Sequence, residues 1–299
     1  MSLQIDCNSP LFLGYNAVGT NCDSPLNPGV YANEMLGSAV SISKYIEGLQ
    51  ARGQYWFSYP MLVAETDRTE KAVERSLSRL RERGTIASPR KGFYVIVPPE
   101  YRAAGCLPAS WFIDDLMKFI NEGYYIGLLS AAELFGAAHH RPQELQVVSE
   151  RAHRPLECGR VRIRFFAKRH IQKTPTTSHK VRTGYMRIST PEATALDLVR
   201  YSFELGGLDS VAVVIAELSE AMKPRELVKA AEFFELSVVQ RLGFILDKIE
   251  RGSLSDPLSR WLVQQRPRLV LLSTERAAEQ FEINERWRLK VNDDIEVEA

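Results

Sequence analysis

Several features that would place a protein in a class at once are missing from this 299-residue sequence. Its longest apolar runs, such as Val211–Ala216, are far shorter than the roughly 20 residues of a membrane-spanning helix. The N-terminus lacks the basic stretch and apolar core of a secretory signal. Four scattered cysteines form no CxxC pair, so no zinc or redox motif follows. These absences favour a cytoplasmic protein with free thiols and no membrane partner.

Motifs of common enzyme classes are also missing. The sequence has no GxGxxG fingerprint, no P-loop, no HExxH and no GxSxG. His139 and His140 are adjacent, whereas one metal on a helix needs ligands four residues apart. A metal-dependent nuclease needs clustered carboxylates, but residues 141–187 hold only 3 acids. Glu192 and Asp197, at a helix start, suit capping or core-edge positions. We therefore expect no catalytic residues, no metal and no cofactor.

The net charge of +1 hides a strong segregation of charge along the chain. Residues 36–100 hold 10 basic and 7 acidic side chains, a net of +3. Residues 141–187 hold 12 basic and 3 acidic side chains, a net of +9, whereas residues 188–299 have 14 basic and 20 acidic ones, a net of −6. Such segregation is typical of a polyanion-binding front on an acidic body, although folding can also intermix the charges.

The clearest local pattern is a helix that ends at Gly84. Asp67 followed by Glu70 resembles a capping box at its start. One face is apolar, with Val73, Leu77 and Leu80. The opposite side is basic, with Lys71, Arg75 and Arg79 spaced by four and Arg68 near them. This face either contacts an anionic partner or is simply solvated, since three glutamates share the helix.

Two shorter helices are predicted before this one, over residues 42–53 and from Pro60 onward. After it, extended segments flank the turn Pro89–Gly92, which carries Arg90 and Lys91. Helix, helix, basic helix and basic hairpin is the order of a winged helix-turn-helix, which we assign to residues 35–100. In such a domain the basic helix enters the major groove and the hairpin grips phosphates. Residues 1–34 are predicted to be an irregular arm.

A proline- and glycine-rich linker leads into a second domain, residues 101–299. Helices are predicted over Trp111–Ile120 and Tyr124–Phe135, and a strand over Glu144–Ser149. A further strand alternates two kinds of residue. Its inward side chains are Val161, Ile163 and Phe165, and its outward ones are Arg160, Arg162 and Arg164. Arginines this dense suggest an anionic partner. The alternative is a solvated face with flat-packed stems.

From Thr190 the pattern becomes helical, beginning with Thr190-Pro191-Glu192 as a capped first turn. Further helices are predicted near Asp209–Met222, Pro224–Phe234, Ser237–Glu250 and Leu258–Gln265, and strands at Arg268–Leu272 and Trp287–Val291. The predicted fold class is therefore α+β: an N-terminal winged helix-turn-helix, then a mixed α/β domain that ends in a mostly helical region.

Taken in order, several segments resemble the AbiEi-type antitoxins of bacterial type IV toxin–antitoxin systems. The segments are Ser76–Leu80, Gly84, Lys91–Tyr94, Pro98, Tyr124–Ala132, Gly136, Thr190–Leu198, Arg241–Leu246 and Trp287–Asn292. The resemblance extends from about Ile42 to Ile295. It implies an autorepressor that binds operator DNA, with inverted repeats in its own promoter, through the winged helix. It also implies an antitoxin domain that neutralises a nucleotidyltransferase-class toxin without a stable complex. Arg160, Arg162 and Arg164 would then help to hold DNA.

Two other functions stay open from the sequence. One is a winged-helix regulator whose second domain senses a ligand or protein and opposes no toxin. The other is a DNA-processing enzyme, which Mg²⁺-dependent nicking of a plasmid would indicate. No heptad repeat indicates an obligate dimer, so we expect a monomer or weak dimer that binds DNA cooperatively.

Overall fold

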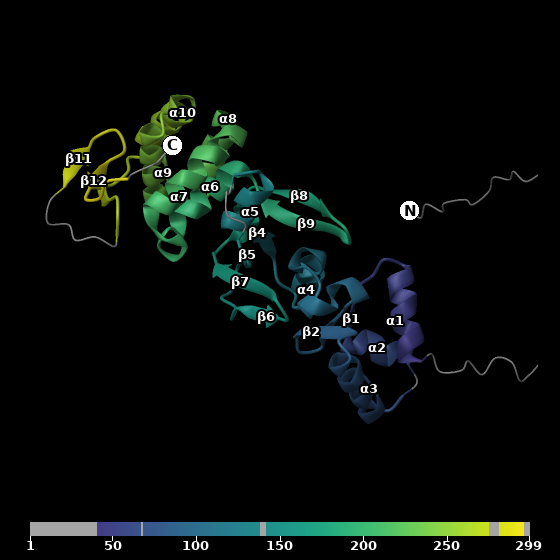
Figure 1. Cartoon of the computed structure of the whole chain (residues 1–299). Helices are drawn as coiled ribbons and strands as arrows, with labels where there is room; N and C mark the ends of the chain where they lie inside the picture. The colour runs from purple at the N-terminus through teal and green to yellow at the C-terminus, as the bar shows by residue number, and fades with distance from the viewer. Residues whose placement is uncertain (1–40, 67, 138–141, 275–280, 296–299) are drawn as a thin grey trace, which may run out of the picture. The chain divides into compact units, whose positions relative to one another are not determined.

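The computed structural model of the chain describes residues 41–66, 68–137, 142–274 and 281–295. Residues 39–299 form one compact unit. The fold is α+β, as the sequence predicts: helices and strands are mixed up to β9, and the part that follows is mainly helical (Figure 1). In the described ranges, every helix is too short or too polar to cross a lipid bilayer.

Residues 42–96 fold into three helices and a three-stranded antiparallel sheet. The elements are α1 (Ile42–Ala51), β1 (Trp56–Ser58), α2 (Tyr59–Glu65), α3 (Glu70–Glu82), β2 (Ile86–Arg90) and β3 (Phe93–Ile96). Strand β3 lies between β1 and β2. The predicted hairpin is present, but its turn is shorter than expected. Pro89 and Arg90 belong to β2, so only Lys91 and Gly92 form the turn.

The helix starts follow ordinary capping chemistry, with one departure. Helix α2 begins at Tyr59, and the predicted Pro60 lies in its first turn, where the Ser58 hydroxyl accepts a hydrogen bond from the Met61 amide (3.3 Å). Helix α3 is capped by Thr69, whose side chain makes no capping hydrogen bond. The predicted capping residue, Asp67, lies outside the described residues. The capping-box prediction therefore misplaced the start of α3.

The next part of the chain is built around a six-stranded mixed sheet of order β6-β7-β5-β4-β9-β8. Its strands are β4 (Tyr124–Ile126), β5 (Leu145–Ser149), β6 (Leu156–Cys158), β7 (Val161–Ala167), β8 (Thr176–Val181) and β9 (Gly184–Ser189). The pairs β5–β7 and β4–β9 are parallel and the other pairs are antiparallel. The accompanying helices are η1 (Pro99–Ala104), η2 (Ala109–Trp111), α4 (Ile113–Phe119), α5 (Leu128–Leu134) and η3 (Ile171–Lys173).

The predicted helix over Tyr124–Phe135 was wrong in its first part. Tyr124–Ile126 form strand β4, and α5 begins only at Leu128. All three residues of β4 are buried, because helices cover both faces of the sheet at this point. A strand buried on both faces loses the period of two that marks a half-exposed strand.

The remainder is mainly helical, as predicted. Its helices are α6 (Pro191–Arg200), η4 (Phe203–Leu205), α7 (Gly207–Leu218), η5 (Ser219–Ala221), α8 (Pro224–Ala231), α9 (Leu236–Lys248) and α10 (Gly252–Gln264). Helix α10 begins at Gly252 rather than at Leu258 and contains Pro257. A small sheet of order β10-β12-β11 completes the chain. Its strands are β10 (Val270–Leu271), β11 (Glu282–Asn284) and β12 (Leu289–Val291).

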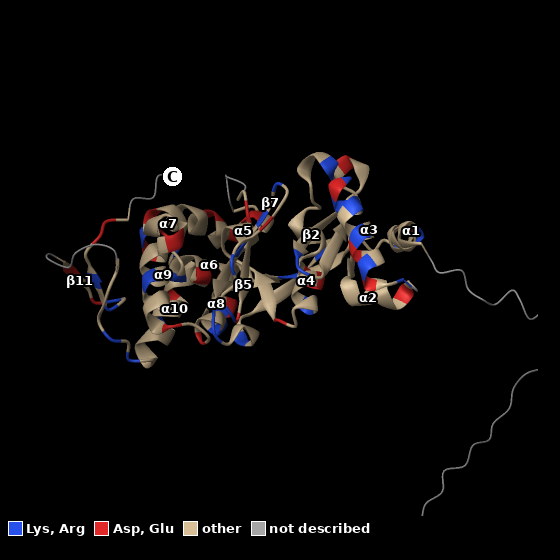
Figure 2. Ribbon diagram, turned by 90° about the horizontal axis from the view of Figure 1, so that it is seen from below, with Lys and Arg blue, Asp and Glu red and all other residues tan. Residues whose placement is uncertain are grey.

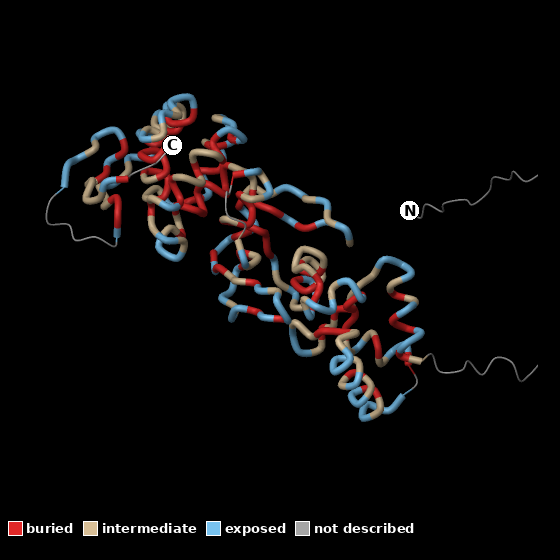
Figure 3. Tube along the Cα trace, viewed as in Figure 1, coloured by how far each residue is buried: buried red, intermediate tan, exposed pale blue. Residues whose placement is uncertain are grey.

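Buried hydrophobic side chains form three clusters. Figure 3 colours the buried residues red along the chain. The largest joins one face of the six-stranded sheet to helices α5–α10. A second lies inside residues 42–96. The third packs Phe93 and Val95 of β3 with Ile113 and Leu116 of α4 and the other face of the large sheet. The two predicted domains therefore share a hydrophobic core.

Candidate nucleic-acid interface

Helix α3 separates apolar and basic side chains as its sequence predicts. Val73 and Leu77 are buried in the core that α3 shares with α1 and the β1-β3-β2 sheet. Lys71, Arg75 and Arg79, spaced by four, are exposed on the outer side. Figure 2 shows the blue bands of Lys and Arg along α3, with acidic residues between them. Packing thus fixes which face of this helix is turned to solvent.

The predicted cations of this region have no acidic partner among the described residues. No carboxylate there lies within 4.0 Å of a basic group of Arg68, Lys71, Arg75 or Arg79. One acid of the helix, Glu82, instead accepts a hydrogen bond from the Ser78 hydroxyl (3.1 Å). Among the described residues these four cations make no ion pair, although Glu70, Glu74 and Glu82 share the helix, so a bound polyanion would not have to displace a paired acid.

The hairpin tip is held in place by hydrogen bonds. The Ser88 hydroxyl lies within hydrogen-bonding distance of the carbonyl oxygens of Arg90 (3.0 Å) and Phe93 (3.2 Å). The amide of Tyr59 at the start of α2 donates to the carbonyl of Gly92 (2.8 Å). Arg90 and Lys91 are exposed at this tip and also lack an acidic partner among the described residues. Hydrogen bonds thus fix the position of the tip. Its two cations make no ion pair within the described part of the chain.

The arginine strand is confirmed as β7 with one correction. Arg162 and Arg164 lie on the strand, but Arg160 precedes it, in the tight turn between β6 and β7. Two of the three are already paired with acids. The Arg162 and Arg164 guanidinium groups lie 3.6 Å from the carboxylates of Glu157 and Glu144, respectively. Their positive charge is therefore partly compensated within the fold.

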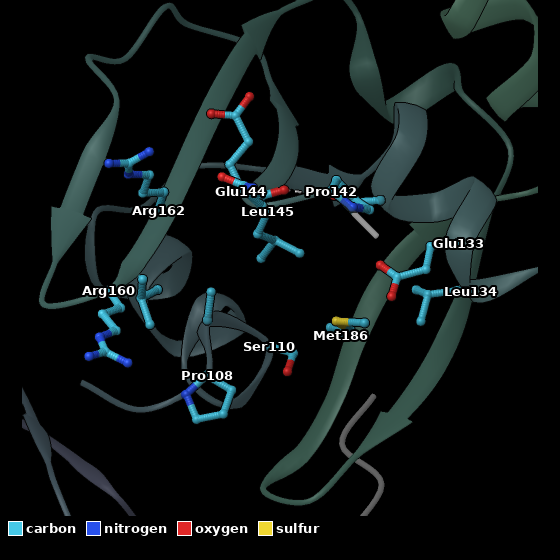
Figure 4. Close-up of a pocket in the computed structure, with 14 residues that line it drawn as sticks. Pro108, Ser110, Glu133, Leu134, Pro142, Glu144, Leu145, Arg160, Arg162 and Met186 are labelled. Carbon is cyan, nitrogen blue, oxygen red and sulfur yellow. Dashed lines mark hydrogen bonds between the residues drawn. The ribbon is translucent and has the colours of Figure 1, made fainter. Parts of the chain in front are cut away.

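A recess of about 300 Å³ opens beside these arginines (Figure 4). Arg160 and Arg162 lie on one side of it and Glu133 lies on the other. Both signs of charge line it, so it does not select for an anion. The described residues contain no cluster of three His, Cys, Asp or Glu side chains that could hold a metal. His139 and His140 lie outside the described residues.

Residues 125–248 match the family model of the AbiEi antitoxin C-terminal domain. These 124 of the 299 residues are similar to an AbiEi antitoxin C-terminal domain, and the matched segment is called the AbiEi domain below. This confirms the resemblance found in the sequence. The matched range contains β7, most of the large sheet and helices α5–α9, so the arginine strand belongs to the AbiEi domain.

Comparison with solved structures supports the same fold. The crystal structure of the RV2827C protein from Mycobacterium tuberculosis superposes with a TM-score of 0.58 at 15% identity. That match covers 83% of this chain and 89% of the other. An antigenic nucleotidyltransferase-like protein from Paracoccidioides brasiliensis gives a TM-score of only 0.32 at 11% identity, over 50% of this chain and 90% of that one. No curated protein matches the chain significantly in sequence.

The AbiEi domain also contains a buried ion pair that the sequence did not reveal. The ammonium of Lys168 lies 2.9 Å from the Asp197 carboxylate, which also accepts a hydrogen bond from the Tyr125 hydroxyl (2.7 Å). The aromatic ring of Phe234 lies 3.5 Å from the same ammonium. Burial lowers the pKa of Lys168, and Asp197 opposes this change. The suggested capping or core-edge role of Asp197 was wrong, because this carboxylate is completely buried.

The AbiEi domain also contains a second basic hairpin, β8–β9, which was not predicted from the sequence. Its turn carries the exposed Arg182, whose guanidinium stacks 4.7 Å from the ring of Trp111. The Thr183 hydroxyl donates to the carbonyl of Trp111 (2.6 Å). Lys180 and Arg187 are exposed on the two strands. The signal that could have found it is the pair of extended segments separated by a short turn that ends in Gly184.

Proposed function

We propose that this chain is a DNA-binding antitoxin that represses its own operon. The observation that carries the proposal is the combination of a segment similar to the AbiEi antitoxin C-terminal domain with six exposed cations that have no ion-pair partner among the described residues. Three of them lie on α3, Arg68 lies just before it, and two lie at the hairpin tip. The chain then acts in the cytoplasm without catalysing a reaction. Its toxin belongs to the nucleotidyltransferase class, is opposed without a stable complex, and makes the system type IV.

In this proposal, residues 42–96 are a winged helix-turn-helix. Helix α3 enters the major groove, where Arg68, Lys71, Arg75 and Arg79 contact bases and phosphates. Arg90 and Lys91 bind the neighbouring phosphates from the hairpin tip. The supporting features are the packed apolar face of α3, which turns its cations outward, and the hydrogen bonds that fix the tip. The chain binds inverted repeats as a monomer or weak dimer, cooperatively.

The AbiEi domain extends the DNA contact through Arg160, Arg162 and Arg164. Arg160 is the strongest contributor of the three, because no described acid lies within ion-pair distance of its side chain. Arg162 and Arg164 must leave Glu157 and Glu144 in order to bind phosphate. The contribution of each to DNA affinity is therefore smaller.

DNA binding is tested with a labelled duplex from the promoter of the chain's own operon, titrated by fluorescence anisotropy at several salt concentrations. The variant Arg75→Gln/Arg79→Gln is compared with the native chain. A matched control, Arg225→Gln/Arg260→Gln, removes two exposed cations from the acidic helical part. We expect only the first variant to lose affinity. Equal losses in both variants would contradict a specific role for α3.

Antitoxin activity is tested by expressing the neighbouring gene alone, with the full chain, and with Arg75→Gln/Arg79→Gln. The full chain is used because residues 101–299 alone would lose the β3 part of the shared core. We expect the neighbour to arrest growth and both forms of the chain to relieve the arrest. A harmless neighbour would favour a regulator with a ligand- or protein-sensing second domain. Arrest that neither form relieves would remove this chain as the antidote.

A further inference from the structure

Two buried cysteines meet where the predicted domains join. Cys106 follows η1, and Cys158 ends β6; they are 1% and 9% exposed. Both belong to the core that β3, α4 and the large sheet share. They are 52 positions apart in the sequence, so their meeting is a product of the fold. A pair of this kind differs from a lone buried thiol, because each sulfur has a potential partner.

The backbone holds these two cysteines side by side. The Arg160 amide donates a hydrogen bond to the Ala104 carbonyl (2.8 Å), which ties the two segments together. Gly159 has a left-handed φ of +58°, and a Cβ there would lie only 2.2 Å from the same carbonyl oxygen. Only glycine permits this approach. Gly105 and Gly159 are chain neighbours of the two cysteines, so their contact brings the two cysteine-bearing segments together. The two thiols are close enough for a hydrogen bond with each other.

The surroundings distinguish the two thiols. A hydrogen bond from the Cys106 thiol lowers the pKa of Cys158, and the backbone amide of Ser88 lowers it further, against the effect of burial. The same thiol–thiol hydrogen bond raises the pKa of Cys106, as do its burial and the charge of Cys158. Cys158 is also the more exposed of the pair. It is therefore the thiol that an oxidant meets first.

We propose that Cys106 and Cys158 form a reversible intramolecular disulfide when the protein meets a peroxide. The Cys158 thiolate attacks one peroxide oxygen, the O–O bond breaks, and hydroxide leaves to become water. Cys158 is then a sulfenic acid. The Cys106 sulfur attacks it, the S–O bond breaks, and the departing hydroxide takes the Cys106 proton as a second water. The two thiols lose two electrons in total, and hydrogen peroxide gains them. An external dithiol reverses the reaction by exchange.

The cross-link acts on the junction between the two predicted domains. Strand β2 packs against β6, and the Ser88 amide of β2 faces the Cys158 sulfur. Cys106 lies in the segment that leaves residues 42–96. A disulfide therefore fixes the β6–β7 hairpin to that segment and closes a long loop, which limits the unfolded chain more than the folded one. The inference does not depend on DNA binding or on a toxin.

The test uses the full chain with Cys7→Ser and Cys22→Ser, so that only the two core thiols remain of the 4 cysteines. The protein is treated with hydrogen peroxide, unfolded, alkylated and weighed by intact mass spectrometry. We expect both thiols to escape alkylation, the mass to fall by two hydrogens, and a dithiol to restore both thiols. The oxidised form should melt about 5–10 °C higher. Both core cysteines are unchanged in this protein. The measurement therefore does not require a substitution in the hydrophobic core that could prevent folding.

Single variants in that background identify the order of the steps. With Cys106→Ala, Cys158 should gain oxygen as sulfenic or sulfinic acid. With Cys158→Ala, Cys106 should remain a free thiol. The proposal is overturned if both thiols of the background chain stay alkylatable after peroxide, or if each gains oxygen without losing hydrogens. A disulfide between molecules, seen as a dimer on a non-reducing gel, would also overturn it.

Discussion

Positive side chains occur in two different electrostatic settings in this molecule. On α3 and the β2–β3 hairpin they are exposed and have no described acidic partner. In the AbiEi domain several are paired: Arg162 and Arg164 with surface acids, and Lys168 with the buried Asp197. An unpaired cation keeps its full attraction for phosphate, whereas a paired one must first release its partner. Residues 42–96 should therefore dominate DNA affinity, and paired cations should matter more for the fold.

The largest expected effect is the loss of the buried pair. Lys168→Met leaves the fully buried Asp197 carboxylate without its cation. Urea unfolding should show a loss of about 3–5 kcal/mol of stability. The matched control is Lys168→Met/Asp197→Leu, which removes both charges and should be less destabilised than Lys168→Met alone. A loss below about 1 kcal/mol for the single variant would show that the pair does not hold the fold.

The next largest effect tests the unpaired cations. Arg75→Gln/Arg79→Gln should weaken operator binding by roughly 30- to 1,000-fold, since each residue contributes about 1–2 kcal/mol. The slope of log K against log salt should fall by about 1.8 if both contact phosphates. The free energy of unfolding, measured with urea, should change by less than about 0.5 kcal/mol per residue, because both side chains are exposed. A loss of stability equal to the loss of affinity would contradict a direct contact.

The same contrast explains what the sequence could predict. Elements with one buried and one exposed face keep a visible period, and α3 and β7 were found because of it. On β7 the period fails at the end of the strand: Phe166, on the side of Arg164, is buried under the helical layer, and Ala167, on the side of Ile163, is exposed. Strand β4, buried on both faces, shows no such period and was predicted as helix.

Pairing between distant residues was out of reach of the sequence. Lys168, the residue after β7, meets Asp197 of α6 only in the folded chain, and neither residue carries a local motif. The acidic partners of the arginine strand are likewise supplied by other segments: Glu157 from β6 and Glu144 from the residue before β5. The hydrophobic period of a helix or strand predicts which charged side chains are exposed. Whether an acid from another segment pairs with such a side chain depends on the topology of the fold. The expected set of DNA-binding arginines was therefore named without knowing which were paired.

A smaller effect should separate the arginines of the AbiEi domain from one another. Arg160→Gln should lower operator affinity by roughly 5- to 10-fold at 0.1 M salt and reduce the salt slope by about 0.9. Arg162→Gln and Arg164→Gln should each have a smaller effect, because their charges are already shared with acids. Anisotropy titrations at four salt concentrations measure all three. An unchanged slope in the triple variant would remove these arginines from the DNA contact.

The smallest effect is a gain of affinity, and it tests the comparison most directly. Glu157→Gln removes the acid that lies 3.6 Å from Arg162 but leaves a side chain of nearly the same shape. If the pairing holds back Arg162, operator affinity should rise about 2-fold, since surface ion pairs are worth at most about 1 kcal/mol. The double variant Glu157→Gln/Arg162→Gln should lose that gain, because no cation is then released. An equal gain in the double variant would mean that Glu157 simply repels DNA, and that pairing does not distinguish the two sets of cations.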